Sequence, residues 1–297
     1  MDHPEDAQPP EPATSAGERR LLDGYSLEMT GKDVAGLWEA RPLIPVGTRV
    51  NVTFLAHESL QMRIAACRAV RDAGFVPVPH ISARRLETTR DLEVFLAALR
   101  EIGAAASVLV VAGDPSRHRG PFPDSLSVIR SGLLEKHGVE EVGFSGYPEG
   151  HPDIEDDELW RHLVEKAALT AERGLRPVVV TQFAFDAEPV AAWVGEVRRW
   201  GIDAPIRIGT PGPAGIARLL AFARRFGIGA NAMIVKKYGF SLTNLVGSAG
   251  PERFVRDLAA RLGAGPDAGD VGLHFYTFGG LPATAEWVVA HTAHGHR

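Results

Sequence analysis

The stretch FVPVPHISARRLETTRDLEVFLAALREIGAAASVLVVAGD, residues 75–114, decides the fold class. It opens with an apolar run at Phe75–Ile81 and closes with another at Ser107–Asp114, and both runs are typical of buried strands. Between them, Asp91–Ile102 has its apolar residues at helical spacing on one face. A strand, a helix and a strand in this order predict two parallel strands joined by a crossover helix.

The same alternation extends through most of the chain. Helical spacing recurs at Leu60–Ala73, Leu159–Arg173 and Val190–Trp200. Eight strand–helix units predict a single closed (β/α)8 barrel, which typically takes about 250 residues. An open doubly wound sheet is disfavoured, because no Gly-x-Gly-x-x-Gly fingerprint follows the first strand. The six further predicted strands are Tyr25–Met29, Arg49–Leu55, Glu141–Pro148, Pro177–Phe183, Ile206–Pro211 and Val271–Phe278.

The two ends of the predicted barrel differ from its regular middle. Residues 1–20 are rich in Pro and polar residues and almost lack large apolar ones, which predicts a disordered tail ahead of a barrel over residues 21–297. The interval 212–270, between the seventh and eighth predicted strands, is long. It predicts extra helices, including Ile216–Phe226 and Pro251–Leu262.

Composition excludes several classes of protein. Of 297 residues, 45% are hydrophobic and 23% are charged, which is ordinary for a soluble globular chain. The net charge of −5 leaves no surplus of positive charge for nucleic acid. The single cysteine, Cys67, rules out a disulfide framework. No apolar run approaches the ~20 residues of a membrane span and no signal sequence opens the chain, so we expect a cytoplasmic protein without membrane partners.

Polar residues at the predicted strand ends form the candidate site, because a barrel carries its active site at the carboxyl ends of its strands. On the first strand Ser26 and Glu28 share one face. If that face points inward, Glu28 is a poorly solvated carboxyl whose pKa would rise, which suits it to proton donation. An exposed or salt-bridged glutamate is the alternative. The other polar residues at or just past strand ends are Thr53, His80, Asp114, Tyr147, His151, Gln182 and Tyr276.

Two of these residues have a pattern of their own. Asp114 follows Gly113, which permits close approach of the backbone to a ligand; a loop-capping aspartate is the alternative. Gln182 follows Val178 and Val180 on one face of its predicted strand, and its amide can donate and accept hydrogen bonds at the edge of a heterocycle. A core glutamine with satisfied hydrogen bonds would show the same sequence pattern. His80 and His151 have no third ligand at metal spacing, so we expect no metal site.

These strand ends, taken in order, resemble motifs of the methylenetetrahydrofolate reductase family. The matches run from about residue 25 to 278. Each one is weak alone, and their order along the chain makes the resemblance specific. The matching segments are YSLE (25–28), VPHI (78–81), Gly113-Asp114, GYPEGHP (146–152), TQFAFD (181–186) and HFYT (274–277).

The resemblance implies a barrel that binds FAD, takes hydride from NADH or NADPH and reduces 5,10-methylenetetrahydrofolate to 5-methyltetrahydrofolate in ping-pong fashion. It implies that Glu28 is the general acid, that Asp114 lies near the pterin and flavin, and that Gln182 and Tyr276 contact the substrate. Members of the family are often dimers or tetramers. The residues that the resemblance assigns to the cofactor are Thr53, His80, Gly113, Asp114, Tyr147, His151 and Lys166.

Two departures from the family pattern keep other functions open. Ala112 stands where the family commonly has Arg, and Ile216 takes the place of an aromatic residue after the seventh strand. The loss of a cation at Ala112 motivates a flavin-free alternative, with hydride passing directly from the nicotinamide. Physiological oxidation of methyl-folate is a second alternative. A folate- or flavin-binding module is a third, against which the acid Glu28 argues.

Overall fold

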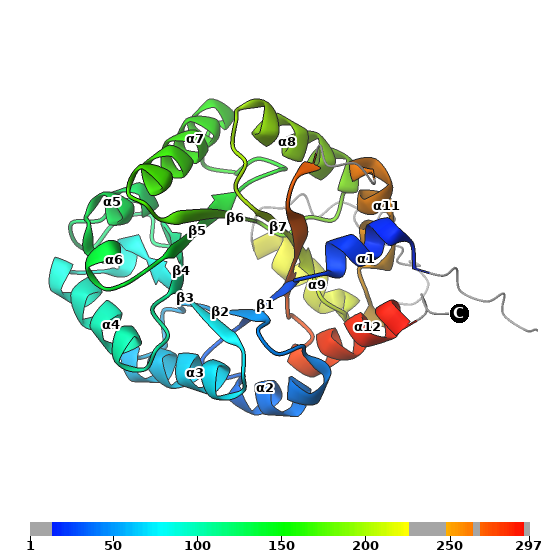
Figure 1. Cartoon of the computed structure of the whole chain (residues 1–297), viewed down its shortest axis with the longest axis horizontal. Helices are drawn as coiled ribbons and strands as arrows, with labels where there is room; N and C mark the ends of the chain where they lie inside the picture. Colours follow the sequence, from blue (N-terminus) through cyan, green and yellow to red (C-terminus); the bar gives the residue numbers. More distant parts are fainter. Residues whose placement is uncertain (1–13, 226–247, 264–267, 294–297) are drawn as a thin grey trace, which may run out of the picture.

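A computed structural model describes residues 14–225, 248–263 and 268–293 of the chain. Eight parallel strands form a closed barrel in the order β1-β10-β7-β6-β5-β4-β3-β2, with helices around it (Figure 1). The predicted (β/α)8 barrel is therefore confirmed. The barrel strands are β1 (Ser26–Met29), β2 (Arg49–Val52), β3 (Val76–Ser82), β4 (Ser107–Val111), β5 (Glu141–Gly146), β6 (Arg176–Thr181), β7 (Ile206–Pro211) and β10 (Val271–Tyr276).

The helices begin where side chains cap them and pack by their apolar faces. In α4, Thr88 caps the first turn, and Leu92, Phe95, Leu96 and Leu99 are all buried. Such faces form the apolar layer between the strands and the helices. The helices are α1 (Ala16–Leu22), α2 (Val34–Ala40), α3 (Leu60–Asp72), α4 (Thr89–Glu101), α5 (Ser125–Arg130), α6 (Leu133–Lys136), α7 (Asp156–Glu172), α8 (Ala187–Arg199), α9 (Ile216–Arg225), α11 (Glu252–Leu262) and α12 (Leu281–Ala293), with 3-10 turns η1 (Arg41–Leu43) and η2 (Ala83–Arg85).

A second, smaller apolar cluster fills the inside of the barrel. Because strand residues alternate between faces, it shares the inward face with the polar residues at the strand ends. At the amino end, Arg49 on β2 reaches Glu141 on β5, with Nη2 and Oε2 2.8 Å apart. The ion pair and the apolar cluster thus occupy the amino end and the middle of the barrel interior, and polar side chains line its carboxyl end. The cluster consists of Val78, Leu109, Val178 and Val180.

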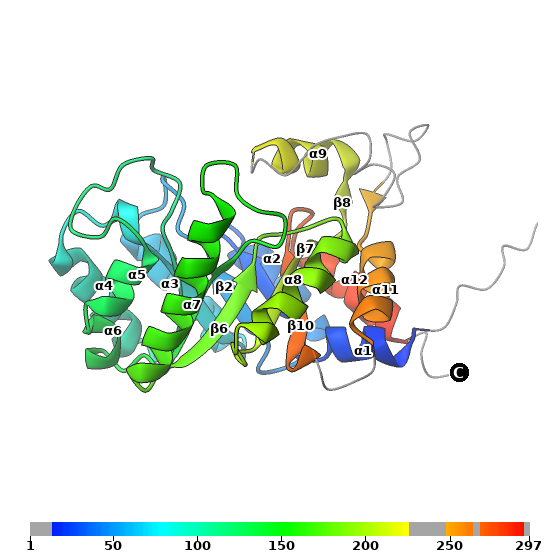
Figure 2. The same ribbon diagram turned by 90° about the horizontal axis from the view of Figure 1, so that it is seen from above.

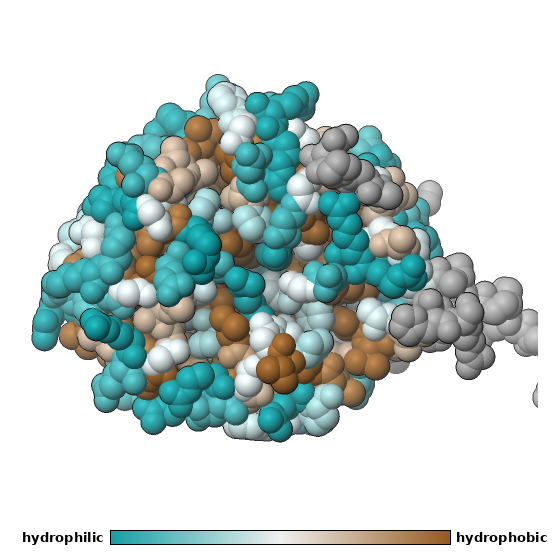
Figure 3. Space-filling view, viewed as in Figure 1, coloured by the Kyte–Doolittle hydropathy of each residue, from teal (hydrophilic) through white to brown (hydrophobic). Residues whose placement is uncertain are grey.

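The two ends of the barrel differ in what covers them. α1 lies at the amino end, and hydrophilic residues surround scattered apolar ones on that face (Figure 3). α9 lies at the opposite end, above the carboxyl ends of the strands (Figure 2). Within the described part of the chain, no helix is long and apolar enough to cross a membrane.

The expected disordered tail is wrong for residues 14–20. Helix α1 begins at Ala16, behind a capping box in which Ser15 and Glu18 satisfy each other's backbone N–H groups. Glu18 is buried, and His291 of α12 lies 3.4 Å from its carboxylate. The helix also packs against α11 and β10. Residues 1–13 lie outside the described residues.

Five predicted strands, the second, fourth, fifth, sixth and eighth, continue too far. Thr53, Asp114 and Gln182 lie in the loops directly after β2, β4 and β6, because pairing with the neighbouring strand stops before the apolar run does. Between β7 and β10 the structure has α9, α11 and the short antiparallel pair β8 (Ala214–Gly215) and β9 (Ser248–Ala249). Both predicted helices are present there, and Phe226 falls outside the described residues.

The packing of α1 can be tested at Glu18. Burial acts to raise the pKa of this carboxyl, but hydrogen bonds from Ser15 and the charge of His291 outweigh burial, and the pKa is lowered below 4.5. Its stabilising effect is therefore present above pH 4.5 and lost as pH falls through the folded value. We expect Glu18→Gln to reduce the free energy of unfolding at pH 7 by about 1 kcal/mol, and the difference from wild type to shrink toward pH 4.

Denaturant unfolding at several pH values measures this difference. Glu39→Gln, on the exposed face of α2, is the control and should change the free energy by less than about 0.5 kcal/mol. Equal effects of the two variants would mean that α1 does not dock as described.

Candidate active site

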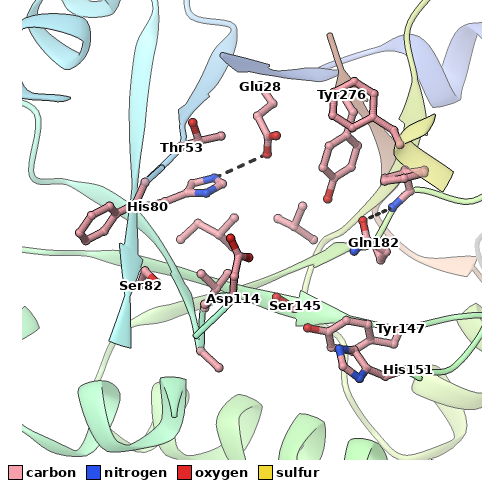
Figure 4. A pocket seen from close by; sticks show the side chains of 18 of the residues that line it. Glu28, Thr53, His80, Ser82, Asp114, Ser145, Tyr147, His151, Gln182 and Tyr276 are labelled. Carbon is pink, nitrogen blue, oxygen red and sulfur yellow. Dashed lines mark hydrogen bonds and ion pairs between the residues drawn. The ribbon is translucent and has the colours of Figure 1, made fainter. Parts of the chain in front are cut away.

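A cavity of about 1850 Å³ opens at the carboxyl ends of the strands (Figure 4). It exceeds the roughly 300–1,000 Å³ of a pocket for one drug-sized ligand, so it has room for a large cofactor and a substrate together. Most of the polar residues at the predicted strand ends lie on its wall. The sequence-predicted residues that line it are Glu28, Thr53, His80, Gly113, Asp114, Tyr147, His151, Gln182 and Tyr276.

Glu28 points into the cavity between two imidazoles. Its Oε2 lies 3.8 Å from Nε2 of His80 on β3 and 3.7 Å from Nε2 of His274 on β10. Thr277 holds the backbone from the other side, because its hydroxyl donates to the Glu28 carbonyl oxygen at 2.6 Å. The inward orientation expected for Ser26 and Glu28 is therefore what the structure has.

The two imidazoles are buried differently. His274 is fully buried, and its Nδ1 lies 2.8 Å from the hydroxyl oxygen of Ser26. His80 reaches the cavity wall, and burial lowers its pKa to about 4, although Glu28 opposes that shift. The sequence placed His274 beside Tyr276 on the eighth predicted strand, within the HFYT segment, but no role was assigned to it. The signal was present, because alternation places it on the same face of its strand as Tyr276.

The ends of β3 and β4 form one wall. Gly113 has a φ of +92°, and a Cβ there would collide with the hydroxyl oxygen of Ser82, so only glycine fits. Asp114 is largely exposed and pairs with Arg85 at 3.2 Å. The hydroxyl oxygens of Ser82 and Thr53 are buried without a hydrogen-bond partner among the described residues. This wall therefore offers unused hydrogen-bonding groups to a ligand.

The opposite wall is aromatic. The Tyr276 hydroxyl donates to the carbonyl oxygen of Thr181 at 3.1 Å, and burial, then the charge of Glu28, raises the pKa of this tyrosine well above its usual value. Gln182 Oε1 accepts from the N–H of Phe183 at 3.1 Å. On α9, Phe222 stacks on Phe278 with ring centroids 3.9 Å apart. A flat ring can stack against such a wall.

Ile216, which was expected to stand where the family has an aromatic residue after the seventh strand, does not line the described part of the cavity. Ile216 is buried, whereas Phe222, six residues further along α9, lines the cavity. The face of α9 that carries Phe222 lies toward the cavity, because the helix lies above the carboxyl ends of the strands (Figure 2).

Lys166 does not join the other predicted residues. It is buried in α7 with its Nζ 5.3 Å from the Phe144 ring, and it is not among the described residues that line the cavity. Burial lowers its pKa to about 8, and the charge of Asp124 opposes that shift. Tyr147 and His151 do lie on the wall, with ring centroids 5.2 Å apart in an edge-to-face contact.

The described part of the wall is more acidic than basic. Among its described residues, carboxylates outnumber Lys and Arg side chains, which disfavours strongly anionic ligands near the acidic β5–α7 loop. Among the described residues, no group of three or more His, Cys, Asp and Glu could hold a metal ion. The acidic residues are Glu28, Asp33, Asp114, Glu149, Asp153, Glu155, Asp156 and Asp186, and the basic ones are Lys32, Arg84, Arg85 and Arg224.

A closed parallel barrel with a polar cavity at the carboxyl ends of its strands defines the class of (β/α)8-barrel enzymes. Within that class, the chain belongs to the methylenetetrahydrofolate reductase family, whose model matches residues 29–234. Glu28 lies one residue before this range, and Tyr276 lies 42 residues after it.

Two curated relatives carry the same family name. Methylenetetrahydrofolate reductase 1 of Schizosaccharomyces pombe is 30% identical over 155 residues, which cover 49% of this chain and 24% of that protein. Methylenetetrahydrofolate reductase 2 of Saccharomyces cerevisiae is 28% identical over 130 residues, covering 40% and 20%. Among solved structures, dihydropteroate synthase from Thermus thermophilus matches at 15% identity with a TM-score of 0.50, covering 93% of this chain and 95% of that one. This last match shows the barrel fold alone.

The chain spans about a quarter of the length of the curated relatives it matches, so their complete activities are not carried over to it by these matches alone.

The buried state of His80 predicts a pH dependence of stability. The unfolded chain binds a proton at this imidazole below pH 6.5, whereas the folded chain does so only near its pKa of about 4. Stability therefore falls as the pH drops from 6.5 toward 4. Relative to a His80→Gln variant, the wild type should lose about 2 kcal/mol of unfolding free energy between pH 7 and pH 5.

Unfolding free energies of the two proteins at pH 7, 6 and 5 measure this loss. His57→Gln, in an exposed loop, is the control and should follow the wild type throughout. A His80→Gln variant that loses stability in parallel with wild type would show that His80 is protonated normally.

Proposed function

We propose that this protein reduces 5,10-methylenetetrahydrofolate to 5-methyltetrahydrofolate with a nicotinamide as the hydride source. The observation that carries the proposal is the carboxyl of Glu28, which projects into the cavity between the buried imidazoles of His80 and His274. Membership of the family supports the reaction class.

Glu28 supplies the proton in this proposal. The folate carries its one-carbon unit in a five-membered ring, and hydride can add only after one nitrogen leaves that carbon to give an iminium ion. The leaving nitrogen needs a proton, and a carboxylic acid with little access to water can deliver it at neutral pH. The side chain of Glu28 is only 18% exposed and faces the cavity. In total, one hydride and one proton are added to the folate.

Gln182 and Asp114 orient the pterin. The amide of Gln182 and the carboxylate of Asp114 both line the cavity, from the loops after β6 and β4, and can pair with the donor and acceptor edge of a heterocycle. The aromatic wall of Tyr276, Phe222 and Phe278 offers a stacking surface for the same ring. Orientation of this kind supports hydride transfer by fixing the distance and angle of approach.

A flavin is the first candidate carrier of the hydride. When bound, it would accept hydride from NADH or NADPH and release it to the folate in a separate step. The buried hydroxyls of Thr53 and Ser82 lack partners among the described residues and fit the polar edge of such a group, and Gly113 lets the backbone pass close to Ser82. Thr53, His80, Gly113, Tyr147 and His151 would hold it. Lys166 is not on the wall, so it has no role in this proposal.

Direct transfer from nicotinamide to folate is the second candidate. At the position where the family has Arg, Ala112 only accepts a backbone hydrogen bond from Arg84. The neighbouring guanidinium groups are engaged by the protein, with Arg84 donating to the carbonyl oxygens of Pro115 and Pro123 and Arg85 pairing with Asp114. A cofactor diphosphate would therefore meet few available cations here.

Replacement of the acid tests the reaction. We expect Glu28→Gln to lower the rate of methylenetetrahydrofolate reduction by about 10³-fold, because the amide cannot donate the required proton. Folate binding, measured by calorimetry, should change by less than about tenfold. Glu155→Gln, on the same cavity wall, is the control and should keep full turnover. Normal turnover by Glu28→Gln would show that another group is the acid.

The absorption spectrum of the purified protein tests the carrier. The flavin route predicts a flavin spectrum that bleaches when NADH or NADPH is added without oxygen. A colourless protein that takes up no added FAD yet reduces methylenetetrahydrofolate would reject the flavin route and establish direct transfer. In that case Ala112→Arg should restore measurable FAD binding, since a guanidinium pairs with phosphate.

A further inference from the structure

Ser26 and His274 form a buried pair behind Glu28. They lie on β1 and β10, where Ser26 is paired in register with His274, and the Ser26 oxygen is 2.8 Å from the imidazole Nδ1. The serine is 2% exposed and the histidine is 0% exposed. Burial restricts water at both groups, so each hydrogen bond that the pair leaves unmade is costly.

Burial of this pair favours one tautomer of His274. Among the described residues, Nδ1 of His274 is the hydrogen-bond partner of the Ser26 hydroxyl. If Nδ1 carried the hydrogen, the serine O–H would be left without an acceptor, and an unpaired buried donor is costly. The serine therefore donates to Nδ1, and the hydrogen of the neutral ring is on Nε2.

That Nε2–H faces Glu28. The nitrogen is buried, has no hydrogen-bond partner among the described residues, and lies 3.7 Å from Oε2 of Glu28. Nε2 of His80 is likewise buried without a partner and lies 3.8 Å from the same oxygen (Figure 4). Both distances exceed hydrogen-bond length, and contacts of this kind commonly tighten when substrate binds. Two imidazoles thus converge on one oxygen of the carboxyl group, and the other oxygen is left for the substrate.

The remaining ionisable groups nearby do not compete for that oxygen. The Tyr276 hydroxyl donates to the Thr181 carbonyl oxygen, although its ring lies 5.0 Å from that of His274. Among the described residues, His80 and His274 are therefore the titratable groups that the structure sets against Oε2 of Glu28.

We propose that Ser26 and His274 are positioning residues that decide which oxygen of Glu28 carries the proton. The serine fixes the Nε2–H tautomer of His274, the two imidazoles hold Oε2 as an acceptor, and the proton occupies Oε1, which faces the substrate. The proposal rests on the proposed function, in which Glu28 is the acid. In the reaction the O–H bond at Oε1 breaks, the proton passes to the leaving nitrogen of the folate, and the carboxylate left behind accepts hydrogen bonds from both imidazoles.

The tautomer can be measured without folate. Nitrogen-15 NMR of histidine-labelled protein distinguishes protonated from unprotonated imidazole nitrogens, and the His274 signals are identified by their loss in His274→Gln. We expect Nε2 of His274 to carry the hydrogen in wild type, and Ser26→Ala to give a mixture of tautomers. An Nδ1–H tautomer in wild type, or an unchanged spectrum in Ser26→Ala, would overturn the proposal.

Two amide variants of His274 test the effect on Glu28. In His274→Gln the side-chain amide nitrogen can take the place of Nε2 and keep its N–H donor, whereas the shorter asparagine of His274→Asn mimics only Nδ1. We expect His274→Gln to keep kcat within about threefold of wild type. His274→Asn should lower kcat by about tenfold and move the alkaline limb of the pH profile up by about one unit, because the carboxylate has lost a donor.

A purely structural role for His274 would give a different result. Both variants would then lower activity alike, with the alkaline limb unmoved, and that outcome would reject the proposal. Circular dichroism establishes that each variant is folded. A wild-type protein that does not turn over methylenetetrahydrofolate would contradict the proposed function, whereas the NMR measurement would still decide the tautomer.

Discussion

The site depends on closure of the barrel between its first and last strands. The parallel pairing of β1 with β10 brings Ser26 next to His274, although 248 positions separate them in the chain. The same seam places Thr277 so that its hydroxyl holds the carbonyl oxygen of Glu28. Without this pairing, the carboxyl group of Glu28 would lack His274 as a neighbour, and its backbone would lack the hydrogen bond from Thr277. The proposed chemistry is therefore a consequence of strand register.

Closure also divides the barrel interior into layers. Alternation sends one face of each strand inward, and that face carries Val78 and Val178 low in the barrel and His80 and Gln182 at the top. Two members of the small apolar cluster, Leu109 and Val180, also line the cavity. The polar cavity residues thus lie at the strand ends, next to apolar side chains. These apolar side chains restrict water near the carboxyl group of Glu28, and the cavity stays open to ligands on its other side.

The sequence was sufficient for the barrel and for most of the candidate wall, because apolar runs and the polar residues that end them are local signals. It was insufficient wherever a distant partner decides the outcome. His274 contacts Ser26 and Glu28 where the last strand of the barrel pairs with the first. No local sequence pattern reports that contact. Lys166 looked like a cofactor ligand by alignment, but the helix turns it toward the Phe144 ring. The missed helix α1 is a different case, since Ser15-x-x-Glu18 is a local capping signal inside a stretch whose composition favoured disorder.

The buried polar atoms around Glu28 do not contribute to the stability of the fold, and a functional role accounts for them better. Nε2 of His80 and of His274 are both buried without a hydrogen-bond partner among the described residues, and each such atom costs stability that an apolar side chain would not. A neutral imidazole close to a carboxyl is an arrangement that folding alone does not favour. In the proposed reaction a proton leaves the carboxyl, and the new negative charge would then lie beside the Nε2–H donor of His274, which needs no reorganisation. On this proposal, the protein gives up stability in the resting state for groups that would act when charge develops on Glu28.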